Sequence, residues 1–403
     1  MRIGRGHFAI VAAGMCAFFN MYITQALLPE LRRAFGAGVA QVSLTVTATT
    51  LGVALAAPFA GGLADRYGRR RVLLVALFLL TLATFGSATA DSLGGLLLWR
   101  ALQGFVIPGI FTSAVAYIAE EWAPAEAASM ASLYVAGTVL GSFCGRFISG
   151  LVTAEYGWRS AFITMGCINF AFLPLIAALL PPSRRFTPST SLLASLSGVG
   201  AHLRNAPLLA TYGIGFTLLF AQVGTFTYVN FYLSAAPFKL STHALSFIFF
   251  VFLIGMAVTP FSGRWSMRWG NRAVGLAALA ASALGLLLTL DHWLPAILLG
   301  LVLSSGGVFI VQSLATATVP RLALGARSAA VGLYLTCYYF GGSVGSSLPA
   351  SIWSYAGWYG CVALVLLVQA CAAVLIQSTW AGRGTRPTPS ASPASAAMTA
   401  CVK

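Results

Sequence analysis

Long runs of apolar residues, interrupted only by short polar segments, make up most of this chain. Most runs are about 20 residues long, the length that an α-helix needs to cross the hydrocarbon core of a bilayer. We therefore expect transmembrane helices near residues 8–28, 42–62, 72–90, 93–118, 130–152, 159–180, 207–233, 243–263, 272–290, 294–318, 328–350 and 358–379. The pattern predicts an all-α integral membrane protein with twelve transmembrane helices in two six-helix pseudo-repeats.

Two polar segments divide the chain. Residues 181–206 carry prolines and arginines and separate the sixth expected helix from the seventh, while residues 381–403 are rich in Ala, Ser, Pro and Thr. We expect an N-terminal six-helix half over 1–180, a cytoplasmic linker over 181–206 and a C-terminal six-helix half over 207–380. Residues 381–403 should form a disordered cytoplasmic tail, because this composition buries little apolar surface.

The two halves echo each other in sequence. Pro58-Phe59-Ala60-Gly61 recurs as Pro260-Phe261-Ser262-Gly263, and the Gly-Trp pair at 157–158 recurs at 357–358. Two echoes at nearly the same period of about 200 residues indicate a duplicated unit, which is common in transporters.

Composition supports a membrane protein and excludes an ordinary soluble domain. Hydrophobic residues make up 59% of the chain and charged residues 8%, with a mean hydropathy of +0.87. The net charge of +15 comes from basic residues in short loops, which suits anionic lipid headgroups better than nucleic acid. The seven cysteines contain no C-x-x-C pair, so neither a disulfide framework nor a zinc site is predicted.

Charge distribution predicts the orientation. If the N-terminus is cytoplasmic, most of the 23 basic residues fall on the cytoplasmic side, and the pair Arg32–Arg33 is an exception. Because Lys and Arg are enriched in cytoplasmic loops, we expect a multi-pass protein of a bacterial inner membrane with both termini in the cytoplasm.

The densest charge lies in residues 61–71, Gly-Gly-Leu-Ala-Asp-Arg-Tyr-Gly-Arg-Arg-Arg, between two expected helices. A charged hinge of this kind must lie at a bilayer face, and Gly68 permits the positive φ that a reversal needs. The run resembles motif A of the major facilitator superfamily, G-x-L-A-D-R-x-G-R-[RK]-x, whose positions are filled by Gly62, Leu63, Ala64, Asp65, Arg66, Gly68, Arg69 and Arg70. A topology anchor without further function is the alternative interpretation.

Arg100 is an ionisable residue inside an expected span, which makes it a candidate for function. Arg100, Gln103 and Gly104 resemble motif B of the same superfamily, R-x-x-Q-G, in which the arginine is assigned to proton coupling or to a buried hydrogen-bond network. Arg100 and Gln103 should share a helix face. The alternative is that Arg100 lies near the outer end of its helix and extends toward water.

A third stretch surrounds a second intramembrane cation, Arg146. Gly137, Gly141 and Gly145 recur every four residues and predict a smooth stripe for close helix packing. The stretch resembles motif C of the antiporter branch, G-x3-G-P-x2-G-G, but Ser142 and Arg146 replace the expected proline and second glycine. Ser142 and Arg146 share a face, so Arg146 is placed to reach a cavity or a carboxylate.

Acidic residues are expected only at helix ends or in loops. Glu30 is the nearest candidate for proton coupling, with a loop pair to Arg33 as the alternative. The resemblance implies that Glu120 joins motif A in a charge relay that latches the cytoplasmic gate, which Arg327 would complete.

Polar residues in the expected spans outline a substrate cavity, or else join helices by hydrogen bonds. They are Asn20, Thr24, Gln222, Thr225, Tyr228, Gln312 and Tyr338.

The resemblance, which extends to the bacterial drug/metabolite:proton antiporter branch (YnfM-type exporters), implies proton-coupled efflux of a small organic compound by alternating access. Its partners would be a small-molecule substrate and the lipid bilayer, and it would bind no nucleic acid. It would be a monomer without catalytic residues, metal or cofactor, and the proton gradient would drive transport. The alternatives are a uniporter, exchanger or importer of a small organic anion that uses Arg100 and Arg146, a membrane-embedded enzyme, and a non-transporting sensor.

Overall fold

The computed structural model describes residues 4–183, 199–323 and 327–380, and every regular element in them is a helix. We call 4–183 the N-terminal half and 199–380 the C-terminal half. The N-terminal half contains α1 (Arg5–Met21), α2 (Ile23–Phe35), α3 (Val39–Tyr67), α4 (Arg69–Ala88), α5 (Leu93–Glu121), α6 (Pro124–Tyr156) and α7 (Trp158–Leu179). The C-terminal half contains α8 (Val199–His202), α9 (Ala206–Ser234), α10 (Thr242–Phe247), η2 (Ile248–Phe250), α11 (Val251–Val258), α12 (Phe261–Leu288), α13 (Leu294–Leu322) and α14 (Arg327–Thr379).

The helices agree with the expected membrane protein. Ten helical segments of the described residues are long and apolar enough to cross a bilayer, counting α1 and α2 as one. A kink at Gly357 divides α14 into two spans, and Thr242–Val258 forms a further short apolar helix, which gives the twelve expected. The expected tail, 381–403, and most of the expected linker lie outside the described residues.

The first span differs from the prediction of one helix over 8–28. It runs from Arg5 to Phe35 and is broken at Tyr22, whose φ of −120° and ψ of 16° are not helical. No proline or glycine marks the break, so its cause lies in the packing around it, described below.

The halves repeat each other in backbone geometry. Gly68 and Gly270 have φ of 94° and 81°, and Gly157 and Gly357 have φ of 80° and 54°. Glycine is the residue that adopts positive φ without strain, so these four positions mark equivalent turns. The bounds of the expected spans 243–263 and 272–290 therefore differ from the prediction. The counterpart of α3 is the segment made of α10, η2, α11 and residues 261–269, and the counterpart of α4 is residues 271–288.

Within each half, helices cross at glycines. In the N-terminal half, Cβ atoms on Gly141 and Gly145 would overlap the backbone of α1 at Met15 and Phe19. In the C-terminal half, Cβ atoms on Gly341 and Gly345 would overlap the backbone of α9 at Phe216 and Phe220. The predicted stripe of α6 is thus confirmed as a packing surface, and α14 carries its counterpart 200 residues later.

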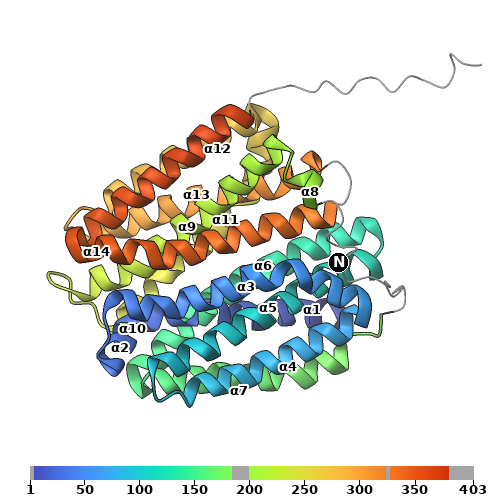
Figure 1. Ribbon diagram of the computed structural model, residues 1–403, viewed down its shortest axis with the longest axis horizontal. Coiled ribbons are helices and arrows are strands. Elements are labelled where there is room, and N and C mark those ends of the chain that lie inside the picture. Colours follow the sequence, from blue (N-terminus) through green and yellow to red (C-terminus); the bar gives the residue numbers. More distant parts are fainter. Residues whose placement is uncertain (1–3, 184–198, 324–326, 381–403) are drawn as a thin grey trace, which may run out of the picture.

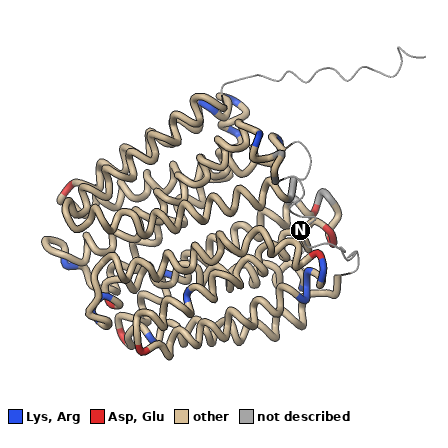
Figure 2. Tube along the Cα trace, viewed as in Figure 1, with Lys and Arg blue, Asp and Glu red and all other residues tan. Residues whose placement is uncertain are grey.

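The two halves lie side by side, with helices of the N-terminal half below those of the C-terminal half in Figure 1. They touch where α3 packs along α14, α2 along α9, and α6 against α10 and α11. We call the end of the bundle that carries Arg66 and Arg69–Arg71 the basic end, and the other the opposite end. Figure 2 shows basic residues at the basic end, close to the N-terminus.

Adjacent glycines in α13 test this packing. Gly307→Ala should lower the melting temperature, because the new Cβ overlaps the Ala278 carbonyl and the Ser282 side chain of α12, and overpacking costs about 1–3 kcal/mol. Gly306→Ala is the matched control, because nothing lies within 4 Å of its Cβ position. The measurement is thermal unfolding of both purified variants in one detergent, and equal melting temperatures would contradict the helix crossing.

Candidate functional site

Arg100 on α5 lies fully buried where the first span breaks. Its Nη1 donates to the Asn20 carbonyl at 2.8 Å, and its Nη2 donates to the Met21 carbonyl at 2.8 Å. The last carbonyls of a helix lack intrahelical partners and carry partial negative charge, so a cation there is favourable. Arg100 therefore caps the end of α1 and accounts for the break at Tyr22.

The remaining bonds of Arg100 make it the centre of a polar network inside the N-terminal half. Its Nε donates to the Thr45 carbonyl of α3 at 3.3 Å, and Nη1 also donates to Gln103 Oε1. Gln103 donates to Thr84 at 2.9 Å, and Thr84 donates to Asn20 Oδ1 at 2.8 Å. The interpretation that Arg100 extends toward water is wrong, and the predicted shared face of Arg100 and Gln103 is confirmed.

Gly104 allows α5 and α3 to approach this closely. A Cβ on Gly104 would overlap the Thr49 backbone, and one on Gly52 would lie 2.8 Å from the Ala101 carbonyl oxygen. Glycine at both crossing points brings Arg100 within reach of Thr45.

Arg146 on α6 lies on the other side of the break, 2% exposed. Its Nε donates to Gln25 Oε1 at 2.7 Å and its Nη1 to the Ser142 carbonyl at 2.7 Å, so the predicted shared face of Ser142 and Arg146 is confirmed. Its guanidinium carbon lies 4.3 Å from the ring centre of Tyr22 and 4.6 Å from that of Phe252. No described residue accepts a hydrogen bond from its Nη2.

Gln25, which the sequence analysis missed, joins Arg146 to the C-terminal half. Its Nε2 donates to Thr227 Oγ1 at 3.2 Å, and its carbonyl accepts from Asn230 Nδ2 at 3.1 Å. A further bond between the halves pairs Thr47 with Ser346 at 2.7 Å. These hydrogen bonds hold the halves together in the part of the bundle that lies between the two arginines and the opposite end.

Neither buried arginine is paired with an acid. Among the described residues, no carboxylate lies within salt-bridge distance of Arg100 or Arg146. Glu30 forms its ion pair with Arg33 at 3.1 Å, as the alternative interpretation expected, but the pair lies inside α2 rather than in a loop. An unpaired buried cation is costly, so its hydrogen bonds and ring contacts must compensate.

The motif A residues form a relay at the basic end. Arg69 bonds to Glu120 at 2.8 Å and pairs with Asp65, while Arg70 donates to the Leu180 and Ala177 carbonyls and caps α7. Gly62 is buried, and Arg66 is exposed beside Tyr67.

This relay lies within the N-terminal half, so it does not by itself hold the halves together. The described side chains do not include that of Arg327, the predicted partner across the halves, which begins α14.

Some of the predicted cavity residues form hydrogen bonds within the protein, and others have polar groups without a described partner. Asn20 belongs to the Arg100 network, Gln222 donates to Ser305 at 3.0 Å, and Tyr228 donates to the Ser346 carbonyl at 2.7 Å. The hydroxyls of Thr24 and Thr225 are buried without a described hydrogen-bond partner.

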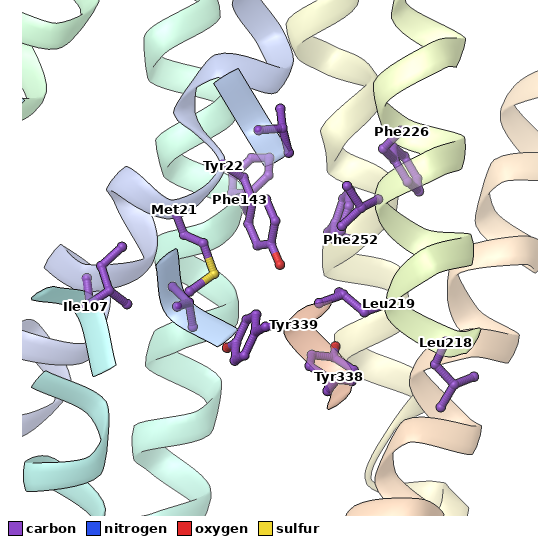
Figure 3. Packing of buried hydrophobic residues seen from close by; sticks show 14 of the residues in the cluster. Met21, Tyr22, Ile107, Phe143, Leu218, Leu219, Phe226, Phe252, Tyr338 and Tyr339 are labelled. Atoms are coloured by element: carbon purple, nitrogen blue, oxygen red, sulfur yellow. The ribbon is translucent and has the colours of Figure 1, made fainter. Parts of the chain in front are cut away.

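Aromatic residues pack between the halves. Tyr22 and Phe143 face Phe252 across the centre of the bundle, with Tyr338 and Tyr339 of α14 farther along (Figure 3). Gln312 is half-buried on α13 and lies close to Tyr338.

Comparison with known sequences gives matches over most of the chain and one over part of it. The family model of the Major Facilitator Superfamily matches residues 10–258 and 233–400. The MFS-type transporter YybF of Bacillus subtilis is 32% identical over 359 residues, which cover 89% of each chain. The inner membrane transport protein YnfM of Escherichia coli is 32% identical over 362 residues, covering 89% of this chain and 87% of the relative. A gallate transporter of Pseudomonas putida matches over 187 residues at 29% identity, covering 45% of this chain and 42% of the relative.

Solved structures share the fold. The human organic anion transporter MFSD10 superposes with a TM-score of 0.72 at 20% identity, covering 93% of this chain and 99% of that one. A bacterial homologue of the human lysosomal transporter Spinster superposes with a TM-score of 0.75 at 15% identity, covering 93% and 96%.

The capping role of Arg100 makes a stability prediction. Arg100→Met keeps most of the volume but leaves the Asn20 and Met21 carbonyls without their donor, so it should cost about 3 kcal/mol and lower the melting temperature by several degrees. Arg71→Met, at an exposed position of the basic end, should leave it unchanged. Thermal unfolding in detergent measures both, and an Arg100→Met variant as stable as the parent would contradict the cap.

Proposed function

The chain belongs to the Major Facilitator Superfamily, a family of membrane transporters rather than enzymes, and we propose that it carries a small organic anion bound by Arg146. The proposed location is a bacterial inner membrane, with the basic end in the cytoplasm, following the excess of basic residues there.

The observation that carries this proposal is that the guanidinium of Arg146 has no acidic partner among the described residues and keeps one nitrogen, Nη2, without a described acceptor. Arg100 is satisfied by backbone carbonyls and by Gln103, whereas Arg146 keeps Nη2 without a described acceptor and has no carboxylate nearby. A substrate carboxylate there would form a charge-assisted bond and offset the cost of the buried cation. Of the two arginines, Arg146 is therefore the one that is available to substrate.

The internal repeat separates function from packing at this position. Residue 346 is the counterpart of Arg146, 200 residues later, and is a serine that bonds to Thr47. The neighbouring glycines, Gly145 and Gly345, pack in the same way in both halves. Since the fold accepts serine at this crossing in one half, the arginine in the other half serves a further purpose.

The surroundings of Arg146 suggest the rest of the substrate. The rings of Tyr22, Phe249 and Phe252 lie within 5.6 Å of its guanidinium carbon, and Phe143 lies in the same region. Aromatic side chains favour a flat apolar body. The partial similarity to a gallate transporter supports an aromatic carboxylate as one member of the class.

Alternating access would open the contacts around Gln25. Gln25 bonds to Arg146 in its own half and to Thr227 in the other, so an anion that draws Arg146 away would weaken the closure of the halves. Binding and opening would thereby be coupled through one side chain.

Proton-coupled efflux of a drug or metabolite is the second candidate function. The motif A residues and the glycine stripe of α6 favour it through their resemblance to the antiporter branch. Seven of the eight acidic residues, however, lie within a turn of a helix end or outside the helices, and Glu30, inside α2, is paired with Arg33, so a proton carrier deeper in the membrane would have to be another group.

Substitution of Arg146 tests the main proposal. Arg146→Gln should lower binding and transport of gallate and benzoate at least tenfold, since a hydrogen bond to a charged group contributes about 1.5–3 kcal/mol. Arg159→Gln, a change in a half-exposed arginine at the opposite end, is the matched control. The measurement is uptake into proteoliposomes together with the melting temperature, and full anion transport by a folded Arg146→Gln protein would contradict the proposal.

A second test uses proteoliposomes with an imposed pH gradient. Lumenal pH is followed while lipophilic cations, neutral drugs, sugars and organic acids are added in turn. The main proposal predicts that organic acids alone are transported. Proton release triggered by lipophilic cations or neutral drugs would overturn it in favour of proton-coupled efflux.

A further inference from the structure

Two tyrosines occupy equivalent positions in the two halves, on the side of Arg146 that leads toward the basic end. Tyr134 lies on α6 and Tyr334 on α14, separated by the same 200 residues as Gly145 and Gly345. Each ring covers a glycine: Cβ atoms on Gly14 and Gly215 would lie 2.6 Å and 2.5 Å from the rings of Tyr134 and Tyr334. The repeat therefore fixes both rings in the same way.

The hydroxyl groups of these tyrosines are unexplained by the fold. Both side chains are 3% exposed, and neither hydroxyl has a hydrogen-bond partner among the described atoms, although Thr316 lies close to Tyr334. A buried unpaired hydroxyl costs about 1–3 kcal/mol, and phenylalanine would fill the same space without that cost. By contrast, the hydroxyl of Tyr228 donates to the Ser346 carbonyl.

A series of tyrosines connects this pair to Arg146. Tyr22 lies against the Arg146 guanidinium, and Tyr339 lies within electrostatic range of Tyr22, Tyr134 and Tyr334. Tyr338 contacts Tyr334 and Tyr339, with ring centres 6.0 Å and 5.3 Å apart. Tyr338 and Tyr339 lie between the halves (Figure 3).

We propose that Tyr134 and Tyr334 form a second binding station for the transported compound, with one hydroxyl donor from each half aimed at its carboxylate oxygens. The station lies about 18 Å from Arg146 along α6, because twelve residues of helix separate Tyr134 from Arg146. This inference rests on the proposed function, since the anion held by Arg146 is the ligand that moves to the tyrosines. O–H···O⁻ bonds to a carboxylate are short and strong, so the station holds the anion after it leaves the arginine.

The hydroxyl deletions Tyr134→Phe and Tyr334→Phe test the station. Because each hydroxyl is unpaired in the protein alone, both variants should melt at or above the parent temperature. The KM for gallate and benzoate uptake should rise about tenfold in each single variant and further in the double variant. Tyr117→Phe is the matched control: it removes a buried hydroxyl of α5 that donates to the Pro181 carbonyl at 2.9 Å, so it should lower the melting temperature without changing KM.

The outcomes separate the two proposals. If gallate, benzoate and succinate show no Arg146-dependent binding to the parent protein, the proposed function fails and the station fails with it. If binding depends on Arg146 but KM is unchanged in the double tyrosine variant, the station alone is overturned. A fall in melting temperature on Tyr134→Phe or Tyr334→Phe would also overturn it, because the hydroxyl would then have a structural partner.

Discussion

The bonds from Arg100 to the carbonyls of Asn20 and Met21 hold the broken first span in place, and the candidate site is built on that break. Without a donor at the end of α1, two buried carbonyls would be left unpaired, which is costly. The break turns Tyr22 toward Arg146 and places Gln25 between the halves. The guanidinium of Arg100 thus fixes the residues that contact the guanidinium of Arg146.

The internal duplication explains the shared helix packing of the two halves, and the differences between the halves explain the candidate site. The turns at Gly68 and Gly270, and the glycine crossings of α6 and α14, show one design used twice. Arg146 has no cationic counterpart, because residue 346 is serine. Tyr134 and Tyr334, by contrast, are present in both halves. The symmetric fold therefore contains one charged site, at Arg146, and one proposed site formed by a tyrosine from each half. This arrangement suits a ligand that moves from the arginine to the tyrosines during transport.

Sequence patterns predicted most of the fold because its signals are local. Apolar run lengths predicted the spans, positive-φ glycine predicted the turn at Gly68, and the period of four predicted the stripe of α6. The break at Tyr22 could not be predicted, since no proline or glycine lies at it and the residue that caps it, Arg100, is far along the chain. The role of Gln25 depends on this break. Tyr134 and Tyr334 did carry a signal, their shared spacing of 200 residues, but the unpaired state of their hydroxyls is a property of packing.

The central claim is that Arg146 is the cation that binds substrate, and a structure with 4-bromobenzoate tests it most directly. Anomalous scattering from bromine would place the ring, and the density would place the carboxylate. The account predicts the carboxylate at Nη2 of Arg146 and the ring between Tyr22 and Phe252. A carboxylate bound at Arg100, or bound between the halves without contact to Arg146, would contradict it.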